Sequence, residues 1–75
     1  MIRLQQRILV VDDEPAILEL VSFNLKKEGY DVITAIDGTS AIEAFRSEKP
    51  DLVLLDLMIP EPDGYEVCRI IRSES

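Results

Sequence analysis

The sequence predicts an α/β protein built on a doubly wound parallel sheet. Strand-like and helix-like segments alternate in the order βαβαβα, which implies right-handed crossovers and helices on both faces of the sheet. The apolar runs at residues 8–11 and Leu52–Leu55 are short and continuous, as is typical of strands buried on both faces. Each run is followed directly by an acidic residue, Asp12 or Asp56. Parallel strands all end at the same edge of their sheet, and that edge is where such folds hold ligands.

The first strand at residues 8–11 precedes a helix that we predict over residues 15–28. Pro15 suits the first turn of a helix, and Gly29 can end one. A wide apolar stripe runs along this helix at helical spacing: Ile17, Leu18, Leu20, Val21 and Leu25.

The second strand and helix are shorter. Asp31–Ala35 is rich in β-branched residues, which favours a strand. A turn and helix cap at residues 37–39 leads into a helix predicted over residues 40–47. Its inward face is expected to hold four apolar residues: Ala41, Ile42, Ala44 and Phe45.

Residues 49–51 break that helix before the third strand, Leu52–Leu55. The loop at residues 57–63 holds two prolines, and Gly64 ends it. A third helix is predicted over residues 65–72, where apolar residues again recur at helical spacing: Val67, Cys68 and Ile71.

Length and composition limit the possible functions. The chain has 75 residues, enough for one small core, and a net charge of −7 that argues against nucleic-acid binding by this segment. The single cysteine, Cys68, excludes an intrachain disulfide. No apolar stretch approaches the ~20 residues of a membrane span, and residues 1–7 are too short for a secretory signal. We therefore expect a cytoplasmic location and no membrane partner.

Three carboxylates are expected to meet at the sheet edge: Asp12, Asp13 and Asp56. Crowded carboxylates repel one another, and a hard cation with oxygen ligands would relieve that repulsion. For each of these three aspartates, a purely structural role is the alternative to binding a cation. Asp12 and Asp13 could favour the N-terminus of the following helix, worth about 0.3–1 kcal/mol each, and Asp56 could cap its strand.

The chain resembles the receiver domain of bacterial two-component response regulators. The resemblance rests on VVDDEP at residues 10–15, DLVLLDLMIP at residues 51–60 and the DG pair at residues 63–64. As in that family, proline follows Asp56 after four residues and glycine after eight. The match spans essentially the whole chain and looks most like the transcription-factor branch, which binds DNA through another domain.

The resemblance implies a flavodoxin-like (CheY-like) fold with strand order 2-1-3-4-5. It also implies that Asp56 accepts a phosphoryl group from a sensor histidine kinase. Mg²⁺ would be bound by the side chains of Asp13 and Asp56 and by the backbone carbonyl of Met58, with Asp12 helping through water or hydrogen bonding. Pro60 and Gly64 would shape the loop after Asp56.

The phosphoacceptor chemistry fits an aspartate. An aspartate carboxylate is ordinarily anionic at neutral pH, and such a nucleophile needs no general base. Its difficulty is that an anion must attack an anionic phosphorus, and Mg²⁺ removes much of this repulsion.

Residues 1–75 are expected to form a partial receiver, because the last two strands and last helix of the family have no counterpart. The hydroxyl and lysine that contact the phosphoryl group in the family lie in those elements. Thr39 and Lys49 cannot replace them by motif, since they belong to other segments.

A second hypothesis is a structural half-receiver that does not signal. In the family's strand order Leu52–Leu55 would become an edge strand, and a long apolar edge invites pairing with another chain. We therefore expect a homodimer, with third strand against third strand, antiparallel across a two-fold axis. The flank of the first helix would also be exposed as an apolar patch.

A third hypothesis, which we discount, is that the chain is a phosphatase of the haloacid dehalogenase type. Such enzymes carry a second Asp two residues after the nucleophile, where this chain has Met58, which cannot transfer a proton. The chain is therefore not expected to be an enzyme.

Overall fold

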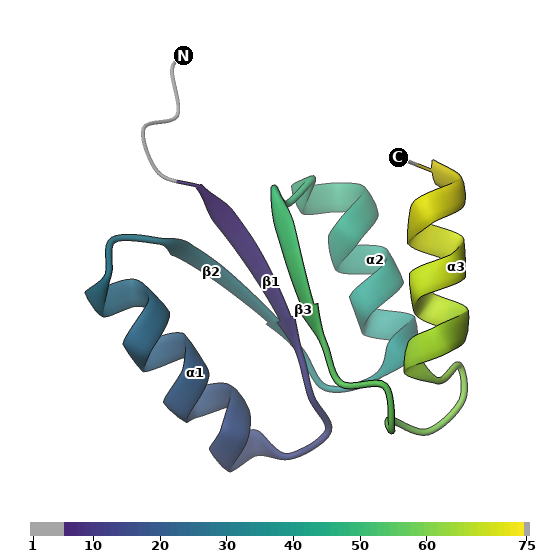
Figure 1. Cartoon of the computed structure of the whole chain (residues 1–75), viewed down its shortest axis with the longest axis horizontal. Helices are drawn as coiled ribbons and strands as arrows, with labels where there is room; N and C mark the ends of the chain where they lie inside the picture. Colours follow the sequence, from purple (N-terminus) through teal and green to yellow (C-terminus); the bar gives the residue numbers. More distant parts are fainter. Residues whose placement is uncertain (1–5, 75) are drawn as a thin grey trace.

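The computed structural model describes residues 6–74, which form three strands and three helices in the predicted order (Figure 1). The elements are β1 (Arg7–Val11), α1 (Pro15–Lys27), β2 (Asp31–Ala35), α2 (Gly38–Glu48), β3 (Leu52–Leu55) and α3 (Gly64–Glu74). The α/β fold class predicted from the sequence is confirmed. The helices α2 and α3 are longer than predicted: each begins at a glycine that we had assigned to the preceding turn or loop, and each also extends past its predicted end, to Glu48 and Glu74.

The three strands form a parallel sheet in the order β2-β1-β3. β1 lies in the centre: Arg7–Val11 pairs with Asp31–Ala35 on one side, and residues 8–11 pair with Leu52–Leu55 on the other. Helix α1 lies on one face of the sheet, and α2 and α3 lie on the other (Figure 1). β3 is therefore an edge strand among the described residues.

The core lies on both faces of β1, because successive side chains of a strand point to opposite faces. Leu9 and Val11 are buried against α2 and α3, in a cluster with four other buried residues: Ala35, Ala41, Ile59 and Val67. Ile8 and Val10 are buried against Leu18 of α1. The inward face predicted for α2 is confirmed by the packing of its apolar residues on the first cluster.

The prediction that β3 is buried on both faces is wrong. Val53 and Leu55 pack on the α2–α3 side, but Leu52 and Leu54 remain 52% and 39% exposed on the α1 side. The physical reason is that α1 packs over β1 and β2 and leaves β3 uncovered. A continuous apolar run therefore does not prove burial on two faces when its strand lies at an edge.

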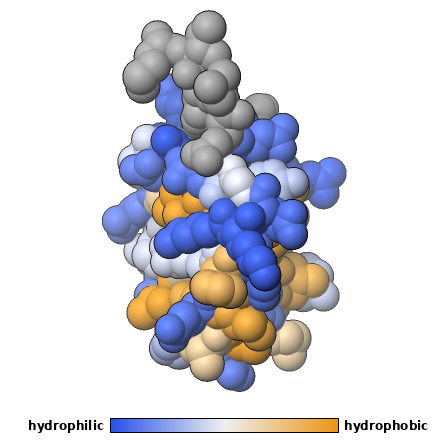
Figure 2. Space-filling model, turned by 90° about the vertical axis from the view of Figure 1, so that its left-hand side faces the viewer, coloured by the Kyte–Doolittle hydropathy of each residue, from blue (hydrophilic) through white to orange (hydrophobic). Residues whose placement is uncertain are grey.

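Only part of the apolar stripe on α1 is buried. Leu18 is buried and Val21 and Leu25 are half-buried, whereas Ile17 and Leu20 are exposed together with Phe23. Figure 2, viewed from the α1 side, shows apolar surface gathered over the lower part of the molecule. The exposed apolar patch expected on this helix is therefore present.

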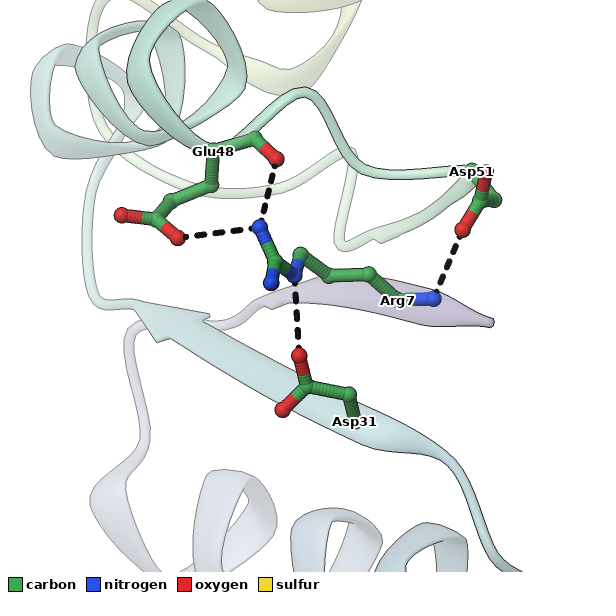
Figure 3. Close-up of polar contacts among 4 residues, drawn as sticks. All are labelled: Arg7, Asp31, Glu48 and Asp51. Atoms are coloured by element: carbon green, nitrogen blue, oxygen red, sulfur yellow. Dashed lines mark hydrogen bonds and ion pairs between the residues drawn. The ribbon is translucent and has the colours of Figure 1, made fainter. Parts of the chain in front are cut away.

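Arg7 forms hydrogen bonds with Asp31, Glu48 and Asp51 (Figure 3). These contacts lie at the end of the sheet opposite to the edge where Asp12 and Asp56 follow their strands. Its guanidinium donates to Asp31 Oδ2 at 2.9 Å, and to the carbonyl and Oε1 of Glu48 at 3.0 and 3.3 Å. Its backbone N–H donates to Asp51 Oδ2 at 2.7 Å, and its carbonyl accepts from the Asp51 N–H at 2.8 Å. A cation is well placed at the C-terminal end of α2, where carbonyl groups face outward. No short-range sequence pattern indicates this role of Arg7, because its partners Asp31 and Asp51 are 24 and 44 residues away in the chain.

Asp37 caps α2 as predicted. Its Oδ1 accepts from the Ser40 N–H at 2.8 Å and from the Ser40 hydroxyl at 2.7 Å. These bonds, the backbone one first, hold the pKa of the Asp37 carboxyl below its ordinary value of 3.8. A pKa that is lower in the folded state stabilises the fold above the unfolded pKa, and this stabilisation is lost as pH falls through the folded pKa.

We therefore expect Asp37→Ala to lower the urea midpoint of unfolding at about pH 7, and the loss to shrink below about pH 4. Asp37→Asn is the matched control, because asparagine caps a helix equally well and does not ionise in this range. Urea titrations followed by circular dichroism would measure both variants. A loss for Asp37→Ala that stays constant down to pH 3 would contradict the role of the ionised cap.

Candidate functional site

Backbone pairing continues past the strand ends and brings the predicted carboxylates to one edge. The N–H of Asp12 donates to the Ala35 carbonyl of β2 at 3.2 Å. The N–H of Asp56 donates to the Val11 carbonyl of β1 at 3.0 Å. The ladder therefore holds the first residue after β1 and the first residue after β3 side by side.

Asp12, Asp13 and Asp56 form one cluster: each has a carboxylate oxygen within 4.8 Å of the others'. Asp12 and Asp56 are half-buried, and Asp13 is exposed. Among residues 6–74 no other group of three or more acidic, histidine or cysteine ligands comes together in this way. Carboxylates this close repel one another, so the site favours a bound cation.

Two of these carboxylates are oriented by the backbone. Asp12 Oδ1 accepts from the Glu14 N–H and Asp56 Oδ1 accepts from the Met58 N–H, each at 2.9 Å. Both are turns in which an Asp side chain binds the amide two residues later. Within the described part of the chain, the second oxygen of each carboxylate has no hydrogen-bond donor.

The loop between Asp56 and α3 is held in place from both ends. A Cβ at Gly64 would lie 2.6 Å from the Asp56 carbonyl oxygen and 2.3 Å from the Leu57 Cα. A Cβ at Gly38 would lie only 2.0 Å from the carbonyl oxygen of Pro62 in the same loop. Gly64 was predicted to shape this loop, and its contact with the backbone of Asp56 gives the physical reason. The contact of Gly38 was missed, because it joins segments far apart in the sequence.

Ile59 anchors the middle of the same loop in the core, where it is 3% exposed. By contrast, Pro60 is exposed and the Met58 side chain is 84% exposed, so neither packs in the core. The backbone of Met58 nevertheless lies beside Asp56 through its N–H bond. That the Met58 carbonyl ligates a metal remains a prediction.

A groove runs from this cluster into the space between α1 and β3. Its apolar wall includes Val10, Ile17, Val21 and Leu54, and it ends at Asp12 and Asp56. Any group that fills the groove would therefore lie against the carboxylates.

The sequence profile of the response regulator receiver domain matches residues 8–75. The chain belongs to this family. It is also 51% identical over 71 residues to the alkaline phosphatase synthesis transcriptional regulatory protein PhoP of Bacillus subtilis, a match that covers 95% of this chain and 30% of that protein.

Solved receivers share the same architecture. The response regulator TrrA from Thermotoga maritima, in complex with Mg²⁺ and BeF, is 46% identical and superposes with a TM-score of 0.90. This match covers 95% of the present chain and 62% of TrrA. A receiver from Methanoculleus marisnigri is 43% identical with a TM-score of 0.87, and the match covers 91% of this chain and 55% of that one.

The flavodoxin-like strand order implied by the resemblance is confirmed for the three strands described. The chain spans less than two thirds of the length of these relatives, and 30% of PhoP. In the part of the chain that the structure covers, the helices are too short or too polar to cross a membrane.

Proposed function

We propose that Asp56 of this receiver accepts a phosphoryl group in a two-component signalling system. The observation that carries the proposal concerns the two carboxylate oxygens of Asp56. One oxygen is fixed by a hydrogen bond, the other has no hydrogen-bond donor among the described residues, and two further carboxylates lie beside them. The Met58 N–H holds Oδ1, so Oδ2 is oriented and free to attack phosphorus. In that step a P–O bond forms to Asp56 as the bond from phosphorus to the donor breaks.

The cluster fits Mg²⁺, which prefers oxygen ligands and keeps several waters. We propose that Asp13 and Asp56 bind it directly, with the Met58 carbonyl as a third ligand and Asp12 acting through water. Bound there, the ion would neutralise charge on the carboxylates and on the incoming phosphoryl oxygens. The clustering of three carboxylates and the uncommitted second oxygen of Asp12 support this assignment.

The donor would be a sensor histidine kinase. TrrA has been solved in complex with the histidine kinase ThkA, and in that complex it is 46% identical to this chain over 95% of the chain. Similarity to PhoP further supports a role in a cytoplasmic, DNA-binding transcriptional regulator. In such a protein this segment would not itself bind nucleic acid, because it carries a net charge of −7. We also propose that it turns over no separate substrate and is not an enzyme.

Intact-mass analysis tests this function. The chain is incubated with a small phosphodonor, with Mg²⁺ or with excess chelator. A single phosphoryl adduct that requires Mg²⁺ is expected. An adduct of equal yield in chelator would contradict the metal-assisted proposal.

A second candidate function is self-association without signalling. The exposed Leu52 and Leu54, on a strand that is at the edge of the sheet among residues 6–74, support it, because apolar edges pair readily with other chains. We propose that two copies join their β3 strands antiparallel across a two-fold axis, giving one continuous sheet. The two candidate functions are tested separately, one by phosphoryl transfer to Asp56 and the other by self-association.

Leu52→Lys is expected to abolish this dimer while leaving the fold intact, because Leu52 is already half exposed and lysine blocks edge pairing. Leu20→Lys on the outer face of α1 is the matched control, with 60% exposure in the unmodified chain. Sedimentation velocity over a range of concentrations would measure both. If the Leu52 variant self-associates as the unmodified chain does, the β3 interface is wrong.

A further inference from the structure

The loop between β3 and α3 lies against the beginning of α2, although the two segments are far apart in the sequence (Figure 1). Gly38, the first residue of α2, is buried. A Cβ placed on it would lie 2.0 Å from the carbonyl oxygen of Pro62 and 2.7 Å from its Cγ. Non-bonded heavy atoms pack at about 3.5–4.0 Å, so a side chain at position 38 would displace Pro62.

The backbone of Gly38 does not by itself require glycine. Its φ is not positive, unlike that of Gly29, so other residues can adopt its conformation. Alanine also favours a helix more than glycine does, and Gly38 begins one. The close approach of Pro62 therefore explains the missing side chain, and the local backbone does not.

Neither side of this contact is free to move away. On the α2 side, the carboxylate of Asp37 caps the helix. On the loop side, Ile59 is anchored in the core, and Asp63 Oδ1 accepts the N–H of Glu66 at 3.0 Å in the first turn of α3. A displaced Pro62 must therefore shift the backbone that precedes it or the backbone that follows it.

Both directions along the chain lead to Asp56. Before Pro62, the loop carries Met58, whose N–H donates to Asp56 Oδ1 at 2.9 Å. After Pro62, Gly64 lies so near the carbonyl oxygen of Asp56 that a Cβ on it would be 2.6 Å away. Crowding at the start of α2 would therefore change how Asp56 and the backbone of Met58 lie relative to each other.

We propose that Gly38 is a positioning residue for the acidic cluster. Because it has no side chain, Pro62 can lie against α2, and this contact sets the place of Met58 beside Asp56. The inference rests on the proposed function for its effect on Mg²⁺ binding. Changing a residue that orients metal ligands typically lowers metal affinity by about 10–100-fold. Gly38→Ala is expected to fall at the lower end of this range, because it acts through the loop.

Nuclear magnetic resonance of the metal-free chain tests the positioning directly. The amide proton of Met58 reports its bond to Asp56, because a hydrogen bond to a carboxylate moves an amide proton downfield. Gly38→Ala is expected to move this resonance upfield. Val32→Ala is the matched control, since Val32 packs with Leu18 on the α1 side of the sheet, away from the loop. It should lower stability and leave the Met58 resonance in place.

Mg²⁺ alone is then titrated into each variant, and the same amide resonances give its dissociation constant. We expect the constant to rise about tenfold in Gly38→Ala and to stay unchanged in Val32→Ala. An equal rise in both variants would show that lost stability is the cause, and this result would overturn the inference.

A double-mutant cycle with Pro62→Gly shows whether the effect passes through this contact, because residues in contact have non-additive effects. Glycine at position 62 lets the loop yield, so Gly38→Ala should change the Met58 resonance less in that background. Equal changes in both backgrounds would overturn the inference. If Gly38→Ala does not fold, Pro62→Gly alone decides, because it weakens the same contact without adding atoms. A Met58 resonance that stays in place would then overturn the inference.

The Met58 resonance requires neither metal nor phosphodonor. It therefore decides the inference even if the chain binds no Mg²⁺ or Asp56 forms no adduct. Those two outcomes would contradict the proposed function instead.

Discussion

Replacing Asp56 with asparagine is expected to abolish the phosphoryl adduct completely. Asparagine has the same shape, and its carbonyl oxygen can still accept the Met58 N–H bond of 2.9 Å, so the turn after β3 should persist. What the variant loses is the anionic carboxylate, of which one oxygen would attack phosphorus and the other would bind the cation. Intact-mass analysis with Mg²⁺ and a small phosphodonor would show the loss directly.

Glu14→Gln is the matched control for that experiment. Glu14 lies next to the cluster in sequence, but its side chain is outside the three-carboxylate group and caps nothing in α1. Replacing the Glu14 carboxylate with an amide should therefore leave the yield of phosphoryl adduct unchanged. If Asp56→Asn still gains the phosphoryl group, another residue is the acceptor and the proposed function fails at its central residue.

Replacing Gly64 with alanine is expected to destabilise the fold by about 1–3 kcal/mol, the usual cost of overpacking. The added Cβ would meet the Leu57 Cα at 2.3 Å and the Asp56 carbonyl oxygen at 2.6 Å, and backbone atoms cannot move aside as a flexible side chain can. Relief requires the chain after Asp56 to shift. Urea denaturation should therefore show a lower midpoint, and the adduct yield at Asp56 should fall as well.

Gly29→Asn is the matched control for glycine loss. Gly29 has a positive φ of 96°, but nothing lies within 4 Å of the position that an added Cβ would take. Asparagine is the residue that best tolerates such a backbone, so this variant should lose less stability and keep the adduct yield. An equal loss of stability in both variants would show that crowding at Gly64 is unimportant.

Local patterns in the sequence were enough to identify all six elements. Helical spacing, the cap at Asp37 and the breaks at Gly29 and residues 49–51 act over a few residues, and the structure agrees with each. The cluster was predictable for a related reason. Parallel strands end at a common edge, so acids directly after two such strands must lie together once the strands are neighbours.

Tertiary structure alone decided which apolar residues are buried and how the site is supported. Leu52 and Ile17 have the same apolar character as Leu9, yet they are exposed because none of the six described elements covers the α1 side of β3. The hydrogen bonds of Arg7 and the contact of Gly38 with Pro62 join residues far apart in the chain. Short-range sequence patterns do not indicate such partners, because contacts between distant segments form only when the whole chain folds.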